Sequence, residues 1–341
     1  MRVSRHRTLG VSLSLILATL TLPSFNVPPS SAASTGAPTF DSPLGITAKG
    51  AHVWVANAAN NSVTELNASD GSLVRIIKTK AEGFQSPIAI GAFKDNVWVV
   101  NKSGNSITEL NASTGALERV IAGASYGLSN PIGLAFAGSN VWVASEDNAV
   151  TEFSALNGAL IRTITAKADS FDNPVNIVVS GPDAWVTNEA GDSVTELNAS
   201  TGTLLRVVDS PVDEFVSPVG LAVSDGHVWV TNASGSSLTE LNASNGSLIR
   251  VVKSSKSGFD APWNLAVGHS RLWIVNANGN SVTEISVTNG SLVRVIKTAA
   301  DGFDNPIDVA LNGSNVWVVN GANNTITELN ALTGSLMRLV R

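Results

Sequence analysis

The chain has 341 residues, 43% of them hydrophobic and only 14% charged, which is enough apolar material for a large buried core. A formal net charge of −6 argues against nucleic acid or an anionic membrane surface as a partner. The chain has no cysteine, so its stability must come from packing and not from disulfide bonds.

Residues 1–33 have the pattern of a secretory signal peptide. Arg2, Arg5 and Arg7 precede an apolar run over residues 9–22, and small residues end the segment at Ala33. An uncleaved membrane anchor is the alternative, but the run is shorter than the roughly 20 residues that span a bilayer. We therefore expect cleavage after Ala33, a short linker over residues 34–39, and a secreted or cell-envelope protein without membrane insertion.

Seven tryptophans recur at a nearly fixed period. They are Trp54, Trp98, Trp142, Trp185, Trp229, Trp273 and Trp317, separated by 44, 44, 43, 44, 44 and 44 residues. Each stands in a phrase close to V-W-V-x-N, and a near copy of N-S-V-T-E-L-N follows it. A period of this length indicates a repeat architecture.

The first repeat, residues 40–83, is predicted to contain four short strands. An apolar segment over residues 44–48 follows Pro43, and proline suits the first residue of a strand. Residues 52–56, 62–66 and 73–77 are also β-rich, and turn-forming residues separate them. Four short strands in about 40–45 residues are typical of a propeller blade.

The predicted fold is all-β: a seven-bladed β-propeller with four antiparallel strands per blade, over residues 40–341. Helical and horseshoe repeats are excluded because no segment shows a sustained 3.6-residue apolar period. The final strand ends at the C-terminus, and Leu44 already opens a whole blade. We therefore expect the ring to close by packing of the first blade against the seventh.

Two repeated features should hold the blades together. The tryptophans are expected to pack between neighbouring blades. Glu65 and Arg75 should face each other on the third and fourth strands, in a register that also opposes Leu66 to Val74. The pair recurs as Glu109/Arg119, Glu152/Arg162, Glu196/Arg206, Glu240/Arg250, Glu284/Arg294 and Glu328/Arg338. We interpret these pairs as structural, the alternative being a ring of carboxylates that binds a ligand.

No catalytic or metal-binding motif is evident in the sequence. His52, His227 and His269 each precede the tryptophan strand of a different blade, so they are interpreted as turn residues that cannot converge on one metal. The chain lacks the nucleophile-elbow, zinc-protease, phosphate-loop and calcium-loop patterns.

The candidate functional residues are those at which the blades differ. The second residue after each blade proline should line the central channel, and it is small in four blades but carries a side-chain oxygen at Asn176, Asn264 and Asp308. Aspartates precede some of the prolines, at Asp41, Asp172, Asp260 and Asp304. We expect an oxygen-rich funnel at one channel mouth, whose ligands suit Mg²⁺ or Ca²⁺. The alternative is that these residues only cap the loop before the first strand.

Trp263 is the one tryptophan outside the repeated phrase, and it is the seventh ligand-binding candidate beside Asn176, Asn264, Asp308, Asp304, Asp260 and Asp172. An exposed indole at this position can stack on a ligand, and plain packing is the alternative. Glu146, Asp147 and Glu189 lie in loops that we expect on the same face.

The repeat resembles the NHL and YVTN propeller families, and most closely the virginiamycin B lyase-like group. The segments 130–135 and 141–143, and again 217–222 and 228–230, are similar to that group's P-x-G-I-T and W-F-T-E phrases. The resemblance implies the propeller fold. It would also imply a magnesium-dependent opening of a cyclic ester by elimination, with a histidine just after a blade proline and glutamates nearby.

This chain departs from that catalytic pattern. The residues after the blade prolines are Leu44, Ile88, Ile132, Val175, Val219, Trp263 and Ile307, so none is histidine. The position of the W-F-T-E glutamate holds Asn57, Asn101, Ser145, Asn188, Asn232, Asn276 and Asn320. The resemblance therefore concerns the scaffold.

Three hypotheses for the function follow. The favoured one is a secreted scaffold without a catalytic set, which binds an unidentified small molecule, glycan or protein at the channel mouth. The second is a metal-assisted lyase or hydrolase that uses Mg²⁺ or Ca²⁺ there. The third is a structural repeat of the cell envelope that has no ligand.

Overall fold

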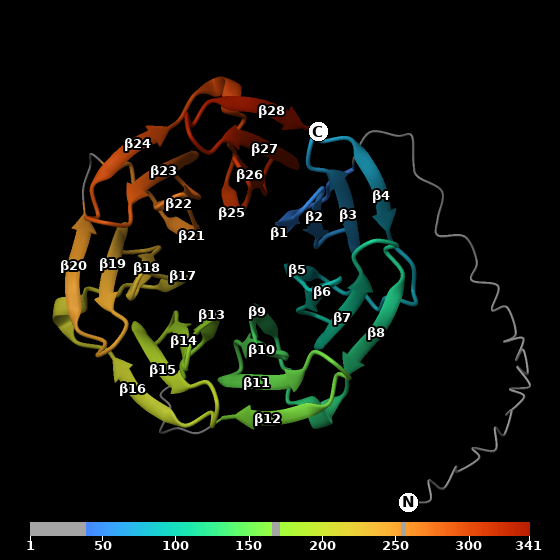
Figure 1. Ribbon diagram of the computed structural model, residues 1–341, viewed down its shortest axis with the longest axis horizontal. Coiled ribbons are helices and arrows are strands. Elements are labelled where there is room, and N and C mark those ends of the chain that lie inside the picture. Colours follow the sequence, from blue (N-terminus) through green and yellow to red (C-terminus); the bar gives the residue numbers. More distant parts are fainter. Residues whose placement is uncertain (1–38, 166–170, 254–256) are drawn as a thin grey trace, which may run out of the picture.

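The computed structural model describes residues 39–165, 171–253 and 257–341, and this part of the chain forms the predicted seven-bladed β-propeller (Figure 1). Each blade is one antiparallel sheet of four strands that are paired in chain order. The predicted signal peptide lies outside the described residues. Within those residues, no helix is long and apolar enough to cross a membrane.

The strands keep nearly the same length in every blade. The inner strands surround the centre of the ring (Figure 1) and are β1 (Pro43–Lys49), β5 (Pro87–Phe93), β9 (Pro131–Ala137), β13 (Pro174–Ser180), β17 (Pro218–Ser224), β21 (Pro262–Gly268) and β25 (Pro306–Asn312). The second strands are β2 (His52–Asn57), β6 (Asn96–Asn101), β10 (Asn140–Ser145), β14 (Asp183–Asn188), β18 (His227–Asn232), β22 (Arg271–Asn276) and β26 (Asn315–Asn320).

The third strands are β3 (Ser62–Asn67), β7 (Ser106–Asn111), β11 (Ala149–Ser154), β15 (Ser193–Asn198), β19 (Ser237–Asn242), β23 (Ser281–Ser286) and β27 (Thr325–Asn330). The outer strands are β4 (Leu73–Ile77), β8 (Leu117–Ala122), β12 (Leu160–Ile164), β16 (Leu204–Val208), β20 (Leu248–Lys253), β24 (Leu292–Ile296) and β28 (Leu336–Val340). Short 3₁₀ turns occur at η1 (Ala124–Tyr126), η3 (Pro211–Asp213) and η4 (Ala299–Asp301).

The tryptophans pack between blades, as predicted. Trp54 on β2 belongs to an apolar cluster with Val97 and Val99 of the next blade. Trp317 of the seventh blade packs in the same way against Val53 and Val55 of the first. The second strands are almost wholly buried because a neighbouring sheet covers each of their faces. The predicted closure of the ring by the first and seventh blades is confirmed.

A second inter-blade contact was not foreseen from the sequence. At the ring closure, Asn324 Oδ1 accepts a hydrogen bond from the Ser42 N–H at 2.8 Å, although the two residues are 282 positions apart. The same bond joins five other junctions: Asn61 with Ser86, Asn105 with Asn130, Asn148 with Asn173, Asp192 with Ser217, and Asn280 with Asn305. The acceptor residues have φ between 46° and 61°, a conformation that Asn and Asp tolerate best after glycine.

The register between the third and fourth strands is partly as predicted. Glu65 does face Arg75, but Leu66 pairs with Leu73 and not with Val74. A β-bulge between Glu65 and Leu66 shifts the ladder by one residue, and the irregularity recurs at this position in all seven blades.

Candidate functional site

All seven blades contribute to one cavity at the centre of the ring. It has a volume of about 1160 Å³ and is lined by the first residues of the inner strands and by the loops that follow the second strands. This volume is slightly above the range of roughly 300–1,000 Å³ that is usual for ligand sites in proteins. We call it the central cavity.

A complete ring of large apolar residues lines the central cavity. These residues directly follow the blade prolines, one per blade, and are Leu44, Ile88, Ile132, Val175, Val219, Trp263 and Ile307. We call this ring the apolar collar. The residue is aliphatic in every blade except the sixth, where it is Trp263, which is 38% exposed. Of these seven positions, only Trp263 was predicted from the sequence to have a role in binding.

Polar residues from the loops at the ends of the inner and second strands also line the cavity, and we call them the polar rim. They are Ser86, Lys102, Glu146, Glu189, Ser234, Ser236, Asp260, Asn278 and Asn305. Lys102 Nζ contacts Glu146 Oε1 at 2.6 Å, which joins the second and third blades. Glu189 accepts a hydrogen bond from the Asn173 side-chain amide at 3.0 Å. The expected placement of Glu146 and Glu189 on this face is confirmed.

The Asp308 carboxylate in the cavity wall accepts three hydrogen bonds. Its Oδ2 accepts the Ile46 N–H at 2.9 Å, and its Oδ1 accepts the Val309 N–H at 2.9 Å and the Asn264 side-chain amide at 2.7 Å. The carboxylate therefore joins the sixth, seventh and first blades. Burial raises the pKa of Asp308 from 3.8 to about 6, although these three hydrogen bonds favour the ionised form.

The two asparagines at the equivalent position also bind their own strands. Asn264 Oδ1 accepts the Leu265 N–H at 2.9 Å, and Asn176 Oδ1 accepts the Ile177 N–H at 2.9 Å. Where the position is glycine, the inner strands approach closely. A Cβ on Gly45 would lie 2.7 Å from the Ile88 carbonyl oxygen. Strand spacing therefore accounts for the small residue in that blade.

The predicted candidates are only partly brought together. Asn176, Asn264, Asp308, Asp260 and Trp263 all line the central cavity. Asp172 lines a separate hollow of about 420 Å³ together with Asn148, Phe171, Gly191, Ser193, Val207 and Asp209. Asp304 lines neither of these spaces, and its carbonyl oxygen accepts the Ala322 N–H. The described residues contain no group of three or more His, Asp or Glu side chains arranged to hold a metal ion.

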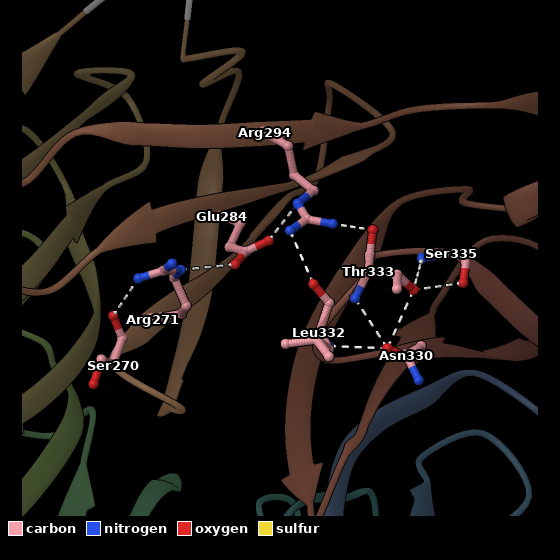
Figure 2. A network of polar contacts seen from close by, with 8 residues as sticks. All are labelled: Ser270, Arg271, Glu284, Arg294, Asn330, Leu332, Thr333 and Ser335. Atoms are coloured by element: carbon pink, nitrogen blue, oxygen red, sulfur yellow. Dashed lines mark hydrogen bonds and ion pairs between the residues drawn. The ribbon is translucent and has the colours of Figure 1, made fainter.

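The repeated glutamates occupy the interior of the blades, as the structural interpretation requires. Each is at most 2% exposed, and its Oε2 contacts the paired arginine, at 2.6–2.9 Å in six blades. Five of these arginines also donate to a carbonyl of the following blade at 2.9–3.2 Å. Figure 2 shows one such unit, in which Glu284 lies between Arg271 and Arg294, and Arg294 reaches Leu332 and Thr333.

The first residue of the second strand completes this unit. In six blades it contacts the glutamate Oε1 at 2.5–3.1 Å, from His52, Asn96, Asn140, His227, Arg271 and Asn315. His52 and His227 are thus strand residues that bind a carboxylate, and only His269 of the three lies in a turn. In the fourth blade the position is Asp183. Burial raises the pKa of Glu196 to about 7, with Arg206 lowering it and Asp183 raising it further.

Comparison with known proteins locates the chain among propellers. Residues 125–338 match the family described as outer membrane protein assembly factor BamB. A comparison with curated proteins gave no match.

Several solved structures have the same fold. A streptogramin B lyase structure has a TM-score of 0.69 at 16% identity and covers 86% of this chain and 95% of its own. A catalytically inactive virginiamycin B lyase from Staphylococcus aureus with quinupristin has a TM-score of 0.71 at 17% identity, and the match covers 87% of this chain and 96% of the lyase chain. Kuenenia stuttgartiensis hydrazine synthase has a TM-score of 0.72 at 15% identity, and the match covers 87% of this chain and 97% of the synthase chain. These identities show the fold alone, which agrees with the scaffold that the sequence resembles.

Proposed function

The chain belongs to the family described as outer membrane protein assembly factor BamB, and on that premise we propose that it is a secreted, non-catalytic scaffold that binds its partner at the central cavity. The observation that carries the proposal is the convergence of all seven blades on one cavity. The repeated tryptophans and glutamates are buried within and between the blades. The residues that differ between blades, such as Asn176, Asn264 and Trp263, line the cavity.

The polar candidates contribute mainly to the wall of the cavity. Asp308, Asn264 and Asn176 direct their oxygens at backbone N–H groups of the inner strands. Selective binding then depends on the side chains around them, which are the apolar collar and the polar rim. The family description favours a polypeptide over a glycan or a small molecule as the partner.

A ligand panel tests this proposal. Melting temperature and binding would be measured for the full chain with soluble peptides, oligosaccharides and cyclic peptides. A binder whose Kd rises at least tenfold in Ile132→Asp, with the fold intact by circular dichroism, supports the central cavity. A binder with unchanged affinity for this variant contradicts the placement of the site.

The second candidate function is a metal-assisted lyase or hydrolase, and it is favoured by the likeness to virginiamycin B lyase. Quinupristin, present in that structure, is the natural probe. The chain would be incubated with quinupristin and Mg²⁺ or Ca²⁺, and the products separated by chromatography. We expect unchanged quinupristin. Turnover that disappears in Asp308→Asn would contradict the non-catalytic proposal.

A further inference from the structure

We propose, building on the binding function above, that the central cavity takes the large apolar side chain of an extended peptide whose neighbouring residues are basic. Three features support this inference: the apolar collar, the charge of the polar rim, and two exposed valines on the segment that precedes β17.

The apolar collar is suited to a large side chain. Seven apolar residues face one space of about 1160 Å³, and the partly buried aliphatic members leave apolar surface in contact with solvent. Filling this space would remove that surface from water, at roughly 25 cal/mol per Å² buried. A hydrated metal ion would gain nothing from such a wall, since Mg²⁺ and Ca²⁺ require oxygen ligands.

Trp263 is held in place by the neighbouring blade. Its carbonyl oxygen accepts a hydrogen bond from Thr231 Oγ1 at 2.9 Å, and Gly220 packs beneath it, where a Cβ would lie 2.6 Å from the same oxygen. The backbone of Trp263 is therefore anchored, while the residue remains 38% exposed. An accessible indole on an anchored backbone is a favourable contact for an apolar or aromatic side chain.

The charge of the polar rim favours basic peptide residues on either side of the inserted apolar side chain. Its ionisable members are Lys102, Glu146, Glu189 and Asp260. Lys102 and Glu146 neutralise each other at 2.6 Å. Glu189 and Asp260 have no cationic partner among the described residues, so the rim presents a net negative charge. Lysine or arginine beside the inserted side chain would complement this charge.

Two exposed valines lie outside the cavity, on the segment that precedes the inner strand of the fifth blade. The Val216 carbonyl accepts the Gly235 N–H at 3.2 Å, which places Val216 beside the loop that supplies Ser234 and Ser236 to the rim. Val216 is 44% exposed, and Val212 on the nearby η3 is 64% exposed. A compact ligand in the cavity would leave these two valines exposed, whereas an extended peptide that leaves the cavity over the fifth blade would cover them.

The tryptophan distribution provides a built-in reporter. Trp263 is 38% exposed, whereas the other seven tryptophans are at most 2% exposed. Quenching of the fluorescence by acrylamide therefore reports mainly on Trp263. The probes are three capped peptides: one with Leu-Phe flanked by lysines, one with alanines in place of Leu-Phe, and one with glutamates in place of the lysines.

We expect the first peptide to lower the quenching constant at least twofold, and the other two to leave it unchanged. Ile132→Asp and Ile132→Ala should abolish this protection. Ile161→Asp, an exposed position on the outer strand β12 of the same blade, is the matched control and should retain it. Melting temperatures would verify that each variant is folded. In parallel, polarisation of a labelled peptide should show weaker binding to Trp263→Ala than to wild type, because the indole contact is lost.

Failure of all three peptides at millimolar concentration would overturn the inference, as would equal protection by all three. The proposed function would survive either result if another ligand in the panel bound in an Ile132-dependent manner. Both the proposed function and the inference would fail if Ile132→Asp weakened the binding of no ligand in the panel.

Discussion

The carboxylate of Asp308 accepts the backbone N–H of Ile46, 262 positions earlier in the chain, and so bonds the last blade to the first. The same carboxylate accepts the Asn264 amide of the sixth blade. The residue that the sequence proposed as a cation ligand is therefore also part of the ring closure.

Asp308→Ala should destabilise the ring. The change leaves the N–H groups of Ile46 and Val309 without their acceptor, and an unpaired buried donor costs about 1–3 kcal/mol. We expect the free energy of unfolding in urea to fall by roughly 2–4 kcal/mol. Asn176→Ala is the control, because its oxygen binds only its own strand, and it should cost less than half as much. Equal losses in the two variants would contradict a closure role.

Asp308→Asn should alter the pH dependence of stability. The pKa of Asp308 is raised from 3.8 to about 6, so the folded state binds the proton more tightly than the unfolded state. This contribution is present in full below pH 3.8 and is lost as the pH rises through 6. Because the cavity admits water, we expect wild type to lose about 1 kcal/mol relative to Asp308→Asn between pH 4 and pH 7. Urea titrations of both proteins at each pH measure this difference, and parallel profiles would exclude it.

Asp183→Asn should stabilise the fourth blade at alkaline pH. The substitution gives Glu196 a side-chain amide donor, like the one that Asn315 provides to Glu328 in the seventh blade. The pKa of Glu328 is about 6, whereas the pKa of Glu196 is about 7. A raised glutamate pKa costs stability as the pH rises through it, so lowering the pKa by one unit recovers about 1.4 kcal/mol above pH 7. Thermal melts should show the gain at pH 8 and little gain at pH 4.5. A gain of the same size at both pH values would point to a cause other than Glu196.

Repetition explains why the fold was predictable. The spacing of the seven tryptophans and the Glu65–Arg75 pairing follow from local patterns that each blade repeats, so each repeat provides independent support for the same strand assignment. The bulge beside Leu66 was missed because it depends on the geometry of the tight turn between β3 and β4, which strand alternation does not encode.

The candidate site was less predictable because it depends on relations between blades. Asp172 and Asp260 occupy equivalent places in the repeat, but only Asp260 lines the central cavity. The apolar collar is visible in the sequence as one large apolar residue after each proline. Its significance depends on closing the ring, which brings Leu44 and Ile307 from opposite ends of the chain to the same cavity.

Arg338→Ala should cost more stability than Arg206→Ala. Both changes leave a buried glutamate without its arginine, which typically costs 3–5 kcal/mol in a fully buried pair and about 2–3 kcal/mol for these partly exposed arginines. Arg338 also donates to the Ser69 carbonyl of the first blade at 2.9 Å, whereas Arg206 has no such inter-blade bond among the described residues. We expect an additional loss of about 1 kcal/mol for Arg338→Ala in urea unfolding. Indistinguishable losses would mean that the bond to Ser69 contributes nothing to closure.

Mg²⁺ and Ca²⁺ should leave the melting temperature within about 1 °C of the metal-free value. The oxygens proposed from the sequence as ligands already accept hydrogen bonds from backbone N–H groups: Asp308 from Ile46 and Val309, and Asn264 from Leu265. A cation would have to break these bonds to be coordinated. A specific site at 100 times its Kd would add about 2.7 kcal/mol, a shift of several degrees. The measurement is a thermal titration to 5 mM of each metal, with Asp308→Ala as the control. A shift of this size in wild type that is absent from the variant would contradict the prediction and favour the metal-assisted enzyme.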